Sequence, residues 1–366
     1  MEPAPENTES TESRESWREF APYLKELARG PDSLADLEPE RCREAVEMIL
    51  AGVASPAQAA SFLMVGRAKG NSASEIAATS LALRSFMRRI EPADGPQLVS
   101  VTGGFDGKLR TVNLGAAASL VAAAAGARVL LLGSEDVPPK EGHTSLTALR
   151  ALGANSPQTL AQARDSLSRN GFAATSLAHY LPELDALLQL RREMARRTAL
   201  NVSEKLVSPV TESAIMVGMT HRKPFLQTMP RALVELGVRR ALVFQAIEGS
   251  DEAPLDGASA LVTIHGGEFR ETAVRPEALG LAKVSRSDIP APGSAGAHPA
   301  HAVLEGGGGS LRDLILYNAA LRIWMSESGG PGEARLEALL AEPLRRARLA
   351  LDEGRAQALL ERLRPA

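Results

Sequence analysis

The stretch QLVSVTGGFDGKLRTVNLGAAASLVAAAAGARVLLLG, residues 97–133, decides the fold. The apolar runs 97–101 and 128–133 are typical of buried strands, and the alanine-rich run 114–127 between them is typical of a tightly packed helix. Two strands that are joined through a helix pair in parallel. Further strand candidates are the segments 239–246 and 260–266. The sequence therefore predicts an α/β unit with a mainly parallel central sheet flanked by helices.

The chain before residue 92 has a different periodicity. Its apolar side chains recur every three or four positions over residues 17–89, which indicates four helices. Ser55 before Pro56 suits the start of a helix, and Ser72 with Glu75 has the spacing of a capping box. This part of the chain is predicted to be a separate all-helical domain.

These changes in pattern divide the chain into three predicted parts. Residues 1–14 are acidic, rich in Ser and Thr and poor in apolar groups, so we expect a disordered tail. A helical N-terminal domain over 15–92 and an α/β domain over 93–366 follow. Near the C-terminus a run of glycines precedes a long helix, which we expect Ser310 to cap, with Asp313 in its first turn.

Composition excludes several classes of protein. The 366 residues carry a net charge of −3, and no apolar run reaches the roughly 18 residues that a membrane-spanning helix needs. Cys42 is the only cysteine, so an internal disulfide and a thiolate metal cluster are excluded. The N-terminus lacks the basic and then apolar pattern of a secretory signal. We therefore expect a cytoplasmic protein without a membrane partner.

Three glycines, Gly103, Gly104 and Gly107, lie between the first strand and the helix that follows it. Backbone N–H groups in such a turn can converge on an anion, and the helix dipole adds a favourable potential. Many α/β proteins have such a turn for its geometry alone. The loop by itself leaves both interpretations open.

The order of several motifs resembles that of the anthranilate phosphoribosyltransferases, members of glycosyltransferase family 3 together with the pyrimidine nucleoside phosphorylases. The similar stretches are SPAQAASFLMVGRAKGNSASEIAA (55–78), VTGGFDG and TVNLGAAASLVAAAAGARV (within 101–129), RREMARRTALN (191–201), VGMTHRKPF (217–225), ALVELGVRRALVFQAIEGSDE (232–252) and VLEGGGGSLRDLILYNAAL (303–321). The resemblance implies that the helical domain includes a later insertion, at about 181–208, and is hinged on a larger α/β lobe. It also implies a substrate cleft between the lobes and a homodimer that pairs through the helical domain.

The resemblance further implies a reaction in which phosphoribosyl pyrophosphate loses pyrophosphate as an amine attacks its anomeric carbon, with Mg²⁺ on the leaving group. Asp251 and Glu252 match the family's metal-holding acid pair. Lys140 and Gly142 match residues that hold pyrophosphate, and Arg191 matches an arginine that faces the aromatic acid. Lys140 and Arg191 are thus the implied catalytic groups. The implied substrate-binding residues are Thr102, Gly103, Gly104, Asp106, Asn113, Gly133 and Gly142.

Five of these residues also have a structural interpretation. Adjacent acids such as Asp251 and Glu252 are common at exposed turns. Lys140 and Arg191 are alternatively solvated surface charges, and Asn113 alternatively caps the helix that follows it.

The chain departs from the family pattern in three places. Val101 and Phe105 replace the first glycine and the aspartate of the family loop G-T-G-G-D, although Asp106 can shift into the second position. Gly115 and Ala116 replace two hydroxyl residues. The family wall K-H-G-N-R becomes Leu131, Leu132, Gly133, Ser134 and Glu135. Because this wall loses donors and gains repulsion toward pyrophosphate, we expect a divergent phosphoribosyl or pentosyl transferase whose acceptor is not anthranilate.

Two other functions stay open. Some non-biosynthetic members of the family resemble this chain in an altered loop, here FDG at 105–107, and members of that branch bind nucleic acid through a basic groove. The basic residues that could form such a groove here are Arg191, Arg192, Arg196, Arg197, Lys205, Arg222 and Lys223. The net charge of −3 and the scarcity of aromatic residues oppose this interpretation. The other alternative is a dimeric sensor of a nucleotide or another phosphate-containing metabolite. His221 is interpreted as a structural residue, and the six histidines show no zinc-binding spacing.

Overall fold

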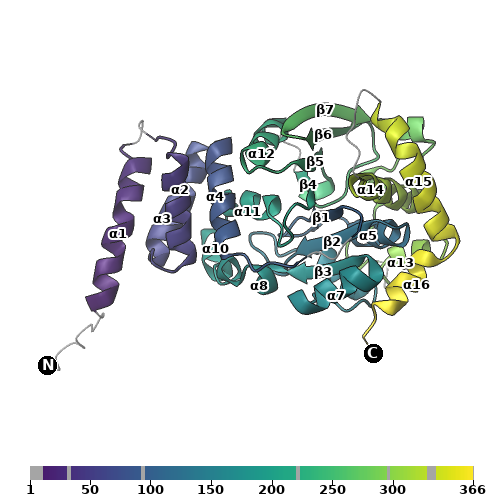
Figure 1. Ribbon diagram of the computed structural model, residues 1–366, viewed down its shortest axis with the longest axis horizontal. Helices are drawn as coiled ribbons and strands as arrows, with labels where there is room; N and C mark the ends of the chain where they lie inside the picture. The colour runs from purple at the N-terminus through teal and green to yellow at the C-terminus, as the bar shows by residue number, and fades with distance from the viewer. Residues whose placement is uncertain are drawn as a thin grey trace.

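A computed structural model describes residues 11–30, 34–91, 95–219, 223–294, 297–327 and 335–365. A helical lobe and a larger α/β lobe lie side by side, with the first described helix, residues 11–27, on the outer side of the helical lobe (Figure 1). The predicted tail 1–14 lies outside the described residues except for its last four, which belong to the first helix.

The helical lobe contains the four predicted helices, α1 (Thr11–Leu27), α2 (Pro39–Leu50), α3 (Pro56–Lys69) and α4 (Ala73–Phe86). The caps at Ser55 and Ser72 are formed as predicted, since each serine accepts from the backbone N–H three residues on. A later segment adds α8 (Leu177–Tyr180), α9 (Pro182–Asp185), α10 (Leu188–Met194), α11 (Ala199–Ser203) and the 3-10 turn η1 (Glu204–Leu206). Since α10 packs on α3 and α11 packs on α3 and α4, this segment belongs with the helical lobe.

The α/β lobe is built on one seven-stranded sheet with the order β3-β2-β1-β4-β5-β6-β7. Its strands are β1 (Leu98–Thr102), β2 (Arg128–Gly133), β3 (Phe172–Ser176), β4 (Ala214–Met219), β5 (Arg240–Gln245), β6 (Ser259–His265) and β7 (Glu268–Val274). The first five pair in parallel, and β6 and β7 are antiparallel. The predicted mainly parallel sheet is confirmed.

Helices cover both faces of this sheet, as Figure 1 shows for α5 and α12. They are α5 (Gly115–Ala124), α6 (Ser145–Ala151), α7 (Leu160–Asn170), α12 (Lys223–Glu235), α13 (Ala300–Leu304), α14 (Ser310–Met325), α15 (Leu336–Asp352) and α16 (Arg355–Arg362). Three short 3-10 turns complete the lobe, η2 (Ile247–Gly249), η3 (Pro276–Leu279) and η4 (Arg286–Asp288). Among the described residues no helix combines the length and the apolar character that crossing a bilayer requires.

The apolar runs of the central strands follow from burial on both faces of the sheet. Val129 and Leu131 of β2 belong to the core beneath α5 and α14, whereas Leu130 and Leu132 belong to the core shared with the helical lobe. One strand therefore connects the two cores. The predicted cap at Ser310 is wrong, because Gly309 takes the capping position with a φ of 101° and Ser310 is already helical.

Candidate functional site

A cleft with a volume of ≈ 810 Å³ opens between the two lobes, beside Met219 at the carboxyl end of β4. Its walls come from α3, α4 and α11 on the helical side, and from the glycine-rich loop and the turn η2 on the other side. The charged residues that line it are Arg67, Asp106, Arg197, Glu204, Lys205 and Glu248. The cleft lies where the motif resemblance implies a substrate site.

The glycine-rich loop buries Phe105 and brings Asp106 to the edge of the cleft. Phe105 is 1% exposed and packs in the core that is shared with the helical lobe. Asp106 forms ion pairs with Arg197 and, at 3.5 Å, with Lys140. Gly104 has no space for a side chain, since an added Cβ would lie 2.9 Å from the Gly249 carbonyl oxygen. The acid of this loop therefore lies in the cleft between two cations.

Lys140 and Gly142, predicted to hold pyrophosphate, both contact the loop backbone. Lys140 Nζ donates to the carbonyl oxygen of Gly107 and, at 3.2 Å, to that of Glu248. Burial lowers the pKa of Lys140. A Cβ on Gly142 would lie 2.6 Å from the Lys108 carbonyl oxygen, so the two chain segments cross in direct backbone contact. In this arrangement both residues fix the shape of the loop.

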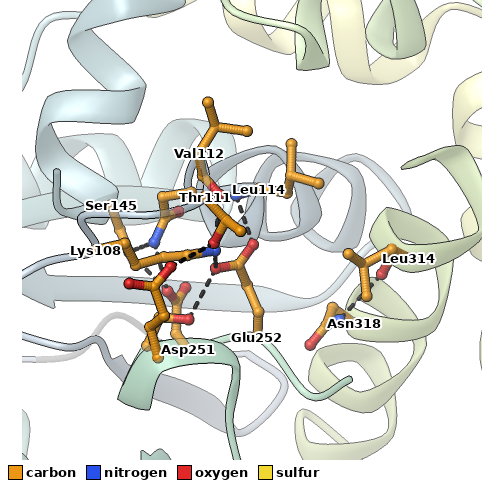
Figure 2. Close-up of polar contacts among 12 residues, drawn as sticks. Lys108, Thr111, Val112, Leu114, Ser145, Asp251, Glu252, Leu314 and Asn318 are labelled. Atoms are coloured by element: carbon orange, nitrogen blue, oxygen red, sulfur yellow. Dashed lines mark hydrogen bonds and ion pairs between the residues drawn. The ribbon is translucent and has the colours of Figure 1, made fainter. Parts of the chain in front are cut away.

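Asp251 and Glu252 follow η2 and are 0% exposed. Asp251 Oδ2 accepts from Arg322 Nη2 at 2.8 Å, and Glu252 Oε2 accepts from Lys108 Nζ at 2.6 Å. Figure 2 shows Lys108 extended between the backbone near Val112 and the Glu252 carboxylate. The side chains of Arg322 and Lys108 are also 0% exposed. Each acid thus has its own buried counterion.

The other oxygens of the two carboxylates are occupied as well. Asp251 Oδ1 accepts from Asn113 Nδ2 at 3.1 Å and from Ser145 Oγ at 2.8 Å. Glu252 Oε1 accepts from the backbone N–H of Leu114 at 2.7 Å (Figure 2). The structure therefore brings predicted residues Asn113, Asp251 and Glu252 into one hydrogen-bonded cluster.

Gly115 is a precondition for this cluster. A Cβ at position 115 would lie 2.1 Å from Asp251 Oδ2, which is far inside van der Waals contact. The backbone at the start of α5 passes directly over Asp251, whose carboxylate accepts a hydrogen bond from Arg322. Asn113 Oδ1 also accepts from the N–H of Ala116 at 3.3 Å, which supports the first turn of α5. The glycine at 115, where the family pattern has a hydroxyl residue, therefore accompanies the inward position of Asp251.

Arg191 lies in α10 and is 1% exposed. Its Nη1 and Nη2 donate to the two carboxylate oxygens of Glu204, each at 2.9 Å. Burial raises the pKa of Glu204, and the Arg191 charge opposes that effect. The interpretation of Arg191 as a solvated surface charge is wrong, because the bidentate pair is enclosed. Glu204 borders the cleft, and Arg191 lies behind it.

Thr102, Gly133 and the two leucines of the altered wall belong to the sheet. Thr102 Oγ1 donates to the Met216 carbonyl oxygen at 3.2 Å, and Gly133 is the last residue of β2. A Cβ on Gly133 would meet Leu146 Cγ at 3.0 Å. Leu131 and Leu132 are 0% exposed. These positions contribute packing at the strand ends.

The basic residues of the predicted nucleic-acid groove are divided between the interior and the surface. Arg191 is buried, Arg192 pairs with Glu141 at 2.5 Å, and Arg197 pairs with Asp106. Exposed Arg196 donates to the carbonyl oxygen of Ala195. Arg222 and His221 lie outside the described residues, and Lys223 is the first residue of α12. A polyanion cannot contact the enclosed guanidinium of Arg191.

Sequence reasoning missed Lys108, Glu204, Glu248 and Arg322. Arg322 gave a signal, because it stands in the apolar run of α14, and a buried cation requires a buried acid. Glu248 accepts from Thr111 Oγ1 at 2.7 Å and from two backbone N–H groups of the loop. Burial alone would raise the pKa of Glu248, but these hydrogen bonds lower it on balance. Nothing in the local sequence identified Glu248 as the residue that anchors the loop.

Two family models match the chain. The model of the glycosyl transferase family, a/b domain, matches residues 98–357, and that of the helical bundle domain of the glycosyl transferase family matches residues 21–87. The chain is 30% identical over 319 residues to an anthranilate phosphoribosyltransferase of Chromobacterium violaceum, covering 87% of this chain and 90% of that protein. For a protein of the same name from Stenotrophomonas maltophilia, the identity is 31% over 309 residues, with coverages of 83% and 89%.

Solved structures agree with these matches. The anthranilate phosphoribosyltransferase of Thermus thermophilus superposes with a TM-score of 0.78 at 29% identity, covering 93% of this chain and 98% of that one. The enzyme of Saccharomyces cerevisiae, in complex with PRPP and Mg, superposes with a TM-score of 0.77 at 18% identity, with coverages of 94% and 97%. The two-lobed fold predicted from the motifs is confirmed.

Proposed function

The chain belongs to glycosyl transferase family 3, and from this we propose that it binds a phosphorylated pentose between its lobes and transfers the pentosyl group to an acceptor other than anthranilate. Its relatives from Chromobacterium violaceum and Stenotrophomonas maltophilia are phosphoribosyltransferases, which supports the reaction class. In such a transfer, the bond from the anomeric carbon to the leaving phosphate oxygen breaks and the acceptor forms the new bond to that carbon. The departing oxygen gains charge, so cations near it stabilise the transition state.

The observation that carries the proposal is the position of three cations, Arg67, Arg197 and Lys205, in the wall of the cleft. Lys205 Nζ donates to the carbonyl oxygens of Gly218, at 3.0 Å, and Gly249, at 2.9 Å. An ammonium group has three donors, so one stays available for a ligand oxygen. Arginine adds planar donors suited to phosphate. The protein itself thus supplies cationic donors for a phosphate group, beside the three acids Asp106, Glu204 and Glu248 of the same lining.

The relative from Saccharomyces cerevisiae was solved with PRPP and Mg. Magnesium in such sites usually binds one or two carboxylates, phosphate oxygens and several waters. Asp251 and Glu252 do not fit an ion of this kind, because both are buried and each is balanced by an internal cation. We propose that the two acids hold Arg322 and Lys108, and no step of the transfer is assigned to a metal.

The choice of acceptor follows from Arg191. The motif resemblance implies that this residue faces the carboxylate of an aromatic acid, but both of its terminal nitrogens are bound to Glu204. Glu204 therefore neutralises the guanidinium, which is not available to the carboxylate of an acidic acceptor. We expect a neutral or basic nucleophile instead.

Calorimetric titration with phosphoribosyl pyrophosphate, in EDTA and in Mg²⁺, tests this function. We expect binding in EDTA that R197Q and K205Q weaken by about tenfold each. R196Q is the matched control, because Arg196 is exposed and lies outside the cleft lining. We also expect no consumption of anthranilate, which its fluorescence reports, and release of pyrophosphate with a neutral or basic amine from a panel of acceptors.

Each contrary result selects another interpretation. Binding only in Mg²⁺ that E252Q abolishes would return the acid pair to metal binding. Absence of heat in both buffers, together with salt-sensitive binding of single-stranded DNA at low ionic strength, would favour the nucleic-acid alternative. Turnover of anthranilate would refute the role assigned to the Arg191–Glu204 pair.

We also propose that two copies pair through the helical lobe, as the resemblance implies. Trp17 on α1 is 46% exposed, whereas Phe20 on the same helix is 0% exposed. An exposed tryptophan is a common anchor of protein interfaces. Light scattering after gel filtration should give twice the chain mass, and a monomer would overturn this proposal.

A further inference from the structure

A second cavity, with a volume of ≈ 490 Å³, lies at the opposite end of the sheet from the cleft. Ile215 near the start of β4 and Arg240 at the start of β5 line it, whereas Met219 at the end of β4 lines the cleft. The cavity also receives residues from the end of α4 and from the segment 208–213. It therefore lies at a second junction of the two lobes, away from the glycine-rich loop.

The lining of this cavity is strongly basic. Four arginines face it together with His265, and Glu212 is the one acid among the lining residues; the arginines are Arg84, Arg89, Arg239 and Arg240. Within the described part of the chain, none of the four forms an ion pair. The acid that acts on the charge of Arg240 is Glu327, which is itself paired with Arg346 at 2.6 Å. The cluster thus carries a local excess of positive charge.

Three of these arginines donate hydrogen bonds to backbone carbonyl oxygens. A carbonyl group carries no net charge, so the positive charge of the side chains is not neutralised. Arg84 Nη1 donates to the Leu236 carbonyl oxygen at 2.8 Å, and Arg240 Nη2 donates to that of Trp324 at 2.8 Å. Arg89 donates to the Ser208 carbonyl oxygen at 3.4 Å and to that of Arg84 at 3.3 Å. Burial and the neighbouring Arg89 charge both lower the pKa of Arg84. Like charges are therefore held close together.

Arg240 is the most enclosed member of the cluster. It is 7% exposed, and its enclosed Nη1 has no hydrogen-bond partner among the described residues. The guanidinium lies over the ring of Trp324, 5.7 Å from the ring centroid, and among the described residues it has no carboxylate partner. A charge of this kind is costly to bury without an anion, so an anion in the cavity would stabilise it.

We propose that this cavity is a second binding site, separate from the cleft, for a small molecule that carries a phosphate group. The arginines bind the phosphate, and the rest of the molecule lies beside neutral polar residues of the lining, Gln97, Thr211 and Ser213. The volume lies within the range of ligand pockets, about 300–1,000 Å³. Enclosure of Arg240 favours a compact ligand over a nucleic-acid strand, since a strand needs an open path for its backbone.

Such a ligand bridges the lobes. Arg84 and Arg89 come from the helical lobe, whereas Arg239 and Arg240 come from the α/β lobe. A phosphate between them removes repulsion across the junction. Bound ligand should therefore raise the thermal unfolding temperature of the whole chain.

Titration of the full chain with AMP, with adenosine as the phosphate-free control, tests the proposal. We expect AMP to bind and adenosine not to bind, with about tenfold weaker AMP binding in R89Q and in R239Q. Arg89 and Arg239 are exposed, so these changes do not remove core packing. R231Q, on the exposed side of α12, is the matched control and binds AMP like the wild type.

Cleft variants separate this site from the proposed transferase function. R197Q should retain AMP binding at the second cavity while it weakens phosphoribosyl pyrophosphate binding. Equal AMP affinity in wild type and in the R89Q/R239Q double variant would overturn the proposal, as would loss of AMP binding in R197Q. The absence of any AMP binding would overturn it too. If single-stranded DNA bound through Arg89 and Arg239 while AMP did not bind, the site would be assigned to a nucleic acid and not to a small molecule.

Discussion

Replacing Glu252 by Gln tests whether the buried acid pair is an internal ion-pair cluster. The side chain keeps its size, but Lys108 loses its anionic partner and retains the carbonyl oxygen of Val112, at 2.7 Å. Lys108 is 0% exposed, so water cannot replace the lost carboxylate. Removing one partner of a buried ion pair costs about 3–5 kcal/mol. We expect E252Q to lower the free energy of unfolding of the α/β lobe by this amount.

Urea denaturation followed by tryptophan fluorescence measures the effect. The chain has two tryptophans, and a W17F background leaves Trp324, which is 5% exposed and two residues from Arg322 in α14. The double variant K108M/E252Q removes both charges and should recover most of the loss, which a double-mutant cycle quantifies. E342Q breaks an exposed pair with Arg345 and serves as the control with an unchanged midpoint.

A magnesium site predicts the opposite sign. Two adjacent carboxylates without a metal repel each other, so E252Q would raise the stability of a metal-free chain. Added Mg²⁺ would then stabilise the wild type and would not stabilise E252Q. Either result would refute the internal ion-pair interpretation of Asp251 and Glu252.

Three further predictions concern Arg191, Gly115 and Lys205. R191M should lower the free energy of unfolding by about 3–5 kcal/mol in urea denaturation, and R191M/E204L should regain most of it, since the pair with Glu204 is enclosed. G115S should destabilise the chain in the same assay, because a Cβ at Gly115 would lie 2.1 Å from Asp251 Oδ2; unchanged stability would mean that Asp251 turns away without cost. Burial lowers the pKa of Lys205 from 10.5 to about 8, so binding of phosphoribosyl pyrophosphate should weaken as pH rises through 8, and K205R should flatten that profile in calorimetry. Between pH 8 and 10.5 the unfolded chain alone holds this proton, so Lys205 makes the free energy of unfolding rise with pH over that interval.

The fold was largely predictable because its signals are local in sequence. The runs at 97–101 and 128–133 became β1 and β2 because both of their faces are covered. Three strands were missed. The sequence analysis identified no strand at β3 or β4, although both are fully buried. Strand β7 was missed because five of its seven residues are exposed and its sequence EFRETAV has no apolar run. Its position comes from pairing with β6 at the edge of the sheet, which is tertiary information.

The chemistry of the site was less predictable because its partners are distant in sequence. Asn113 and Asp251 were both identified, but their shared contact with Ser145 spans three separate segments. Arg322 lies 71 residues from Asp251, and Lys108 lies 144 residues from Glu252. A motif shows which side chain is present. Whether that side chain is free to bind a ligand, or is neutralised by a buried partner, depends on the residues that pack against it.

The internal pairs also constrain how this chain can change. Three charged positions that the motif resemblance assigns to ligands, at Arg191, Asp251 and Glu252, each hold a buried partner of opposite charge. Removing one member of a buried pair does not open its partner to solvent. The partner stays in the protein interior as an unpaired charge, which lowers the free energy of unfolding by about 3–5 kcal/mol. That cost is a large share of the roughly 5–15 kcal/mol that stabilises a typical domain. If the proposed function holds, metal or anthranilate binding would require coordinated changes at both members of a pair, together with a side chain at Gly115 that turns Asp251 outward.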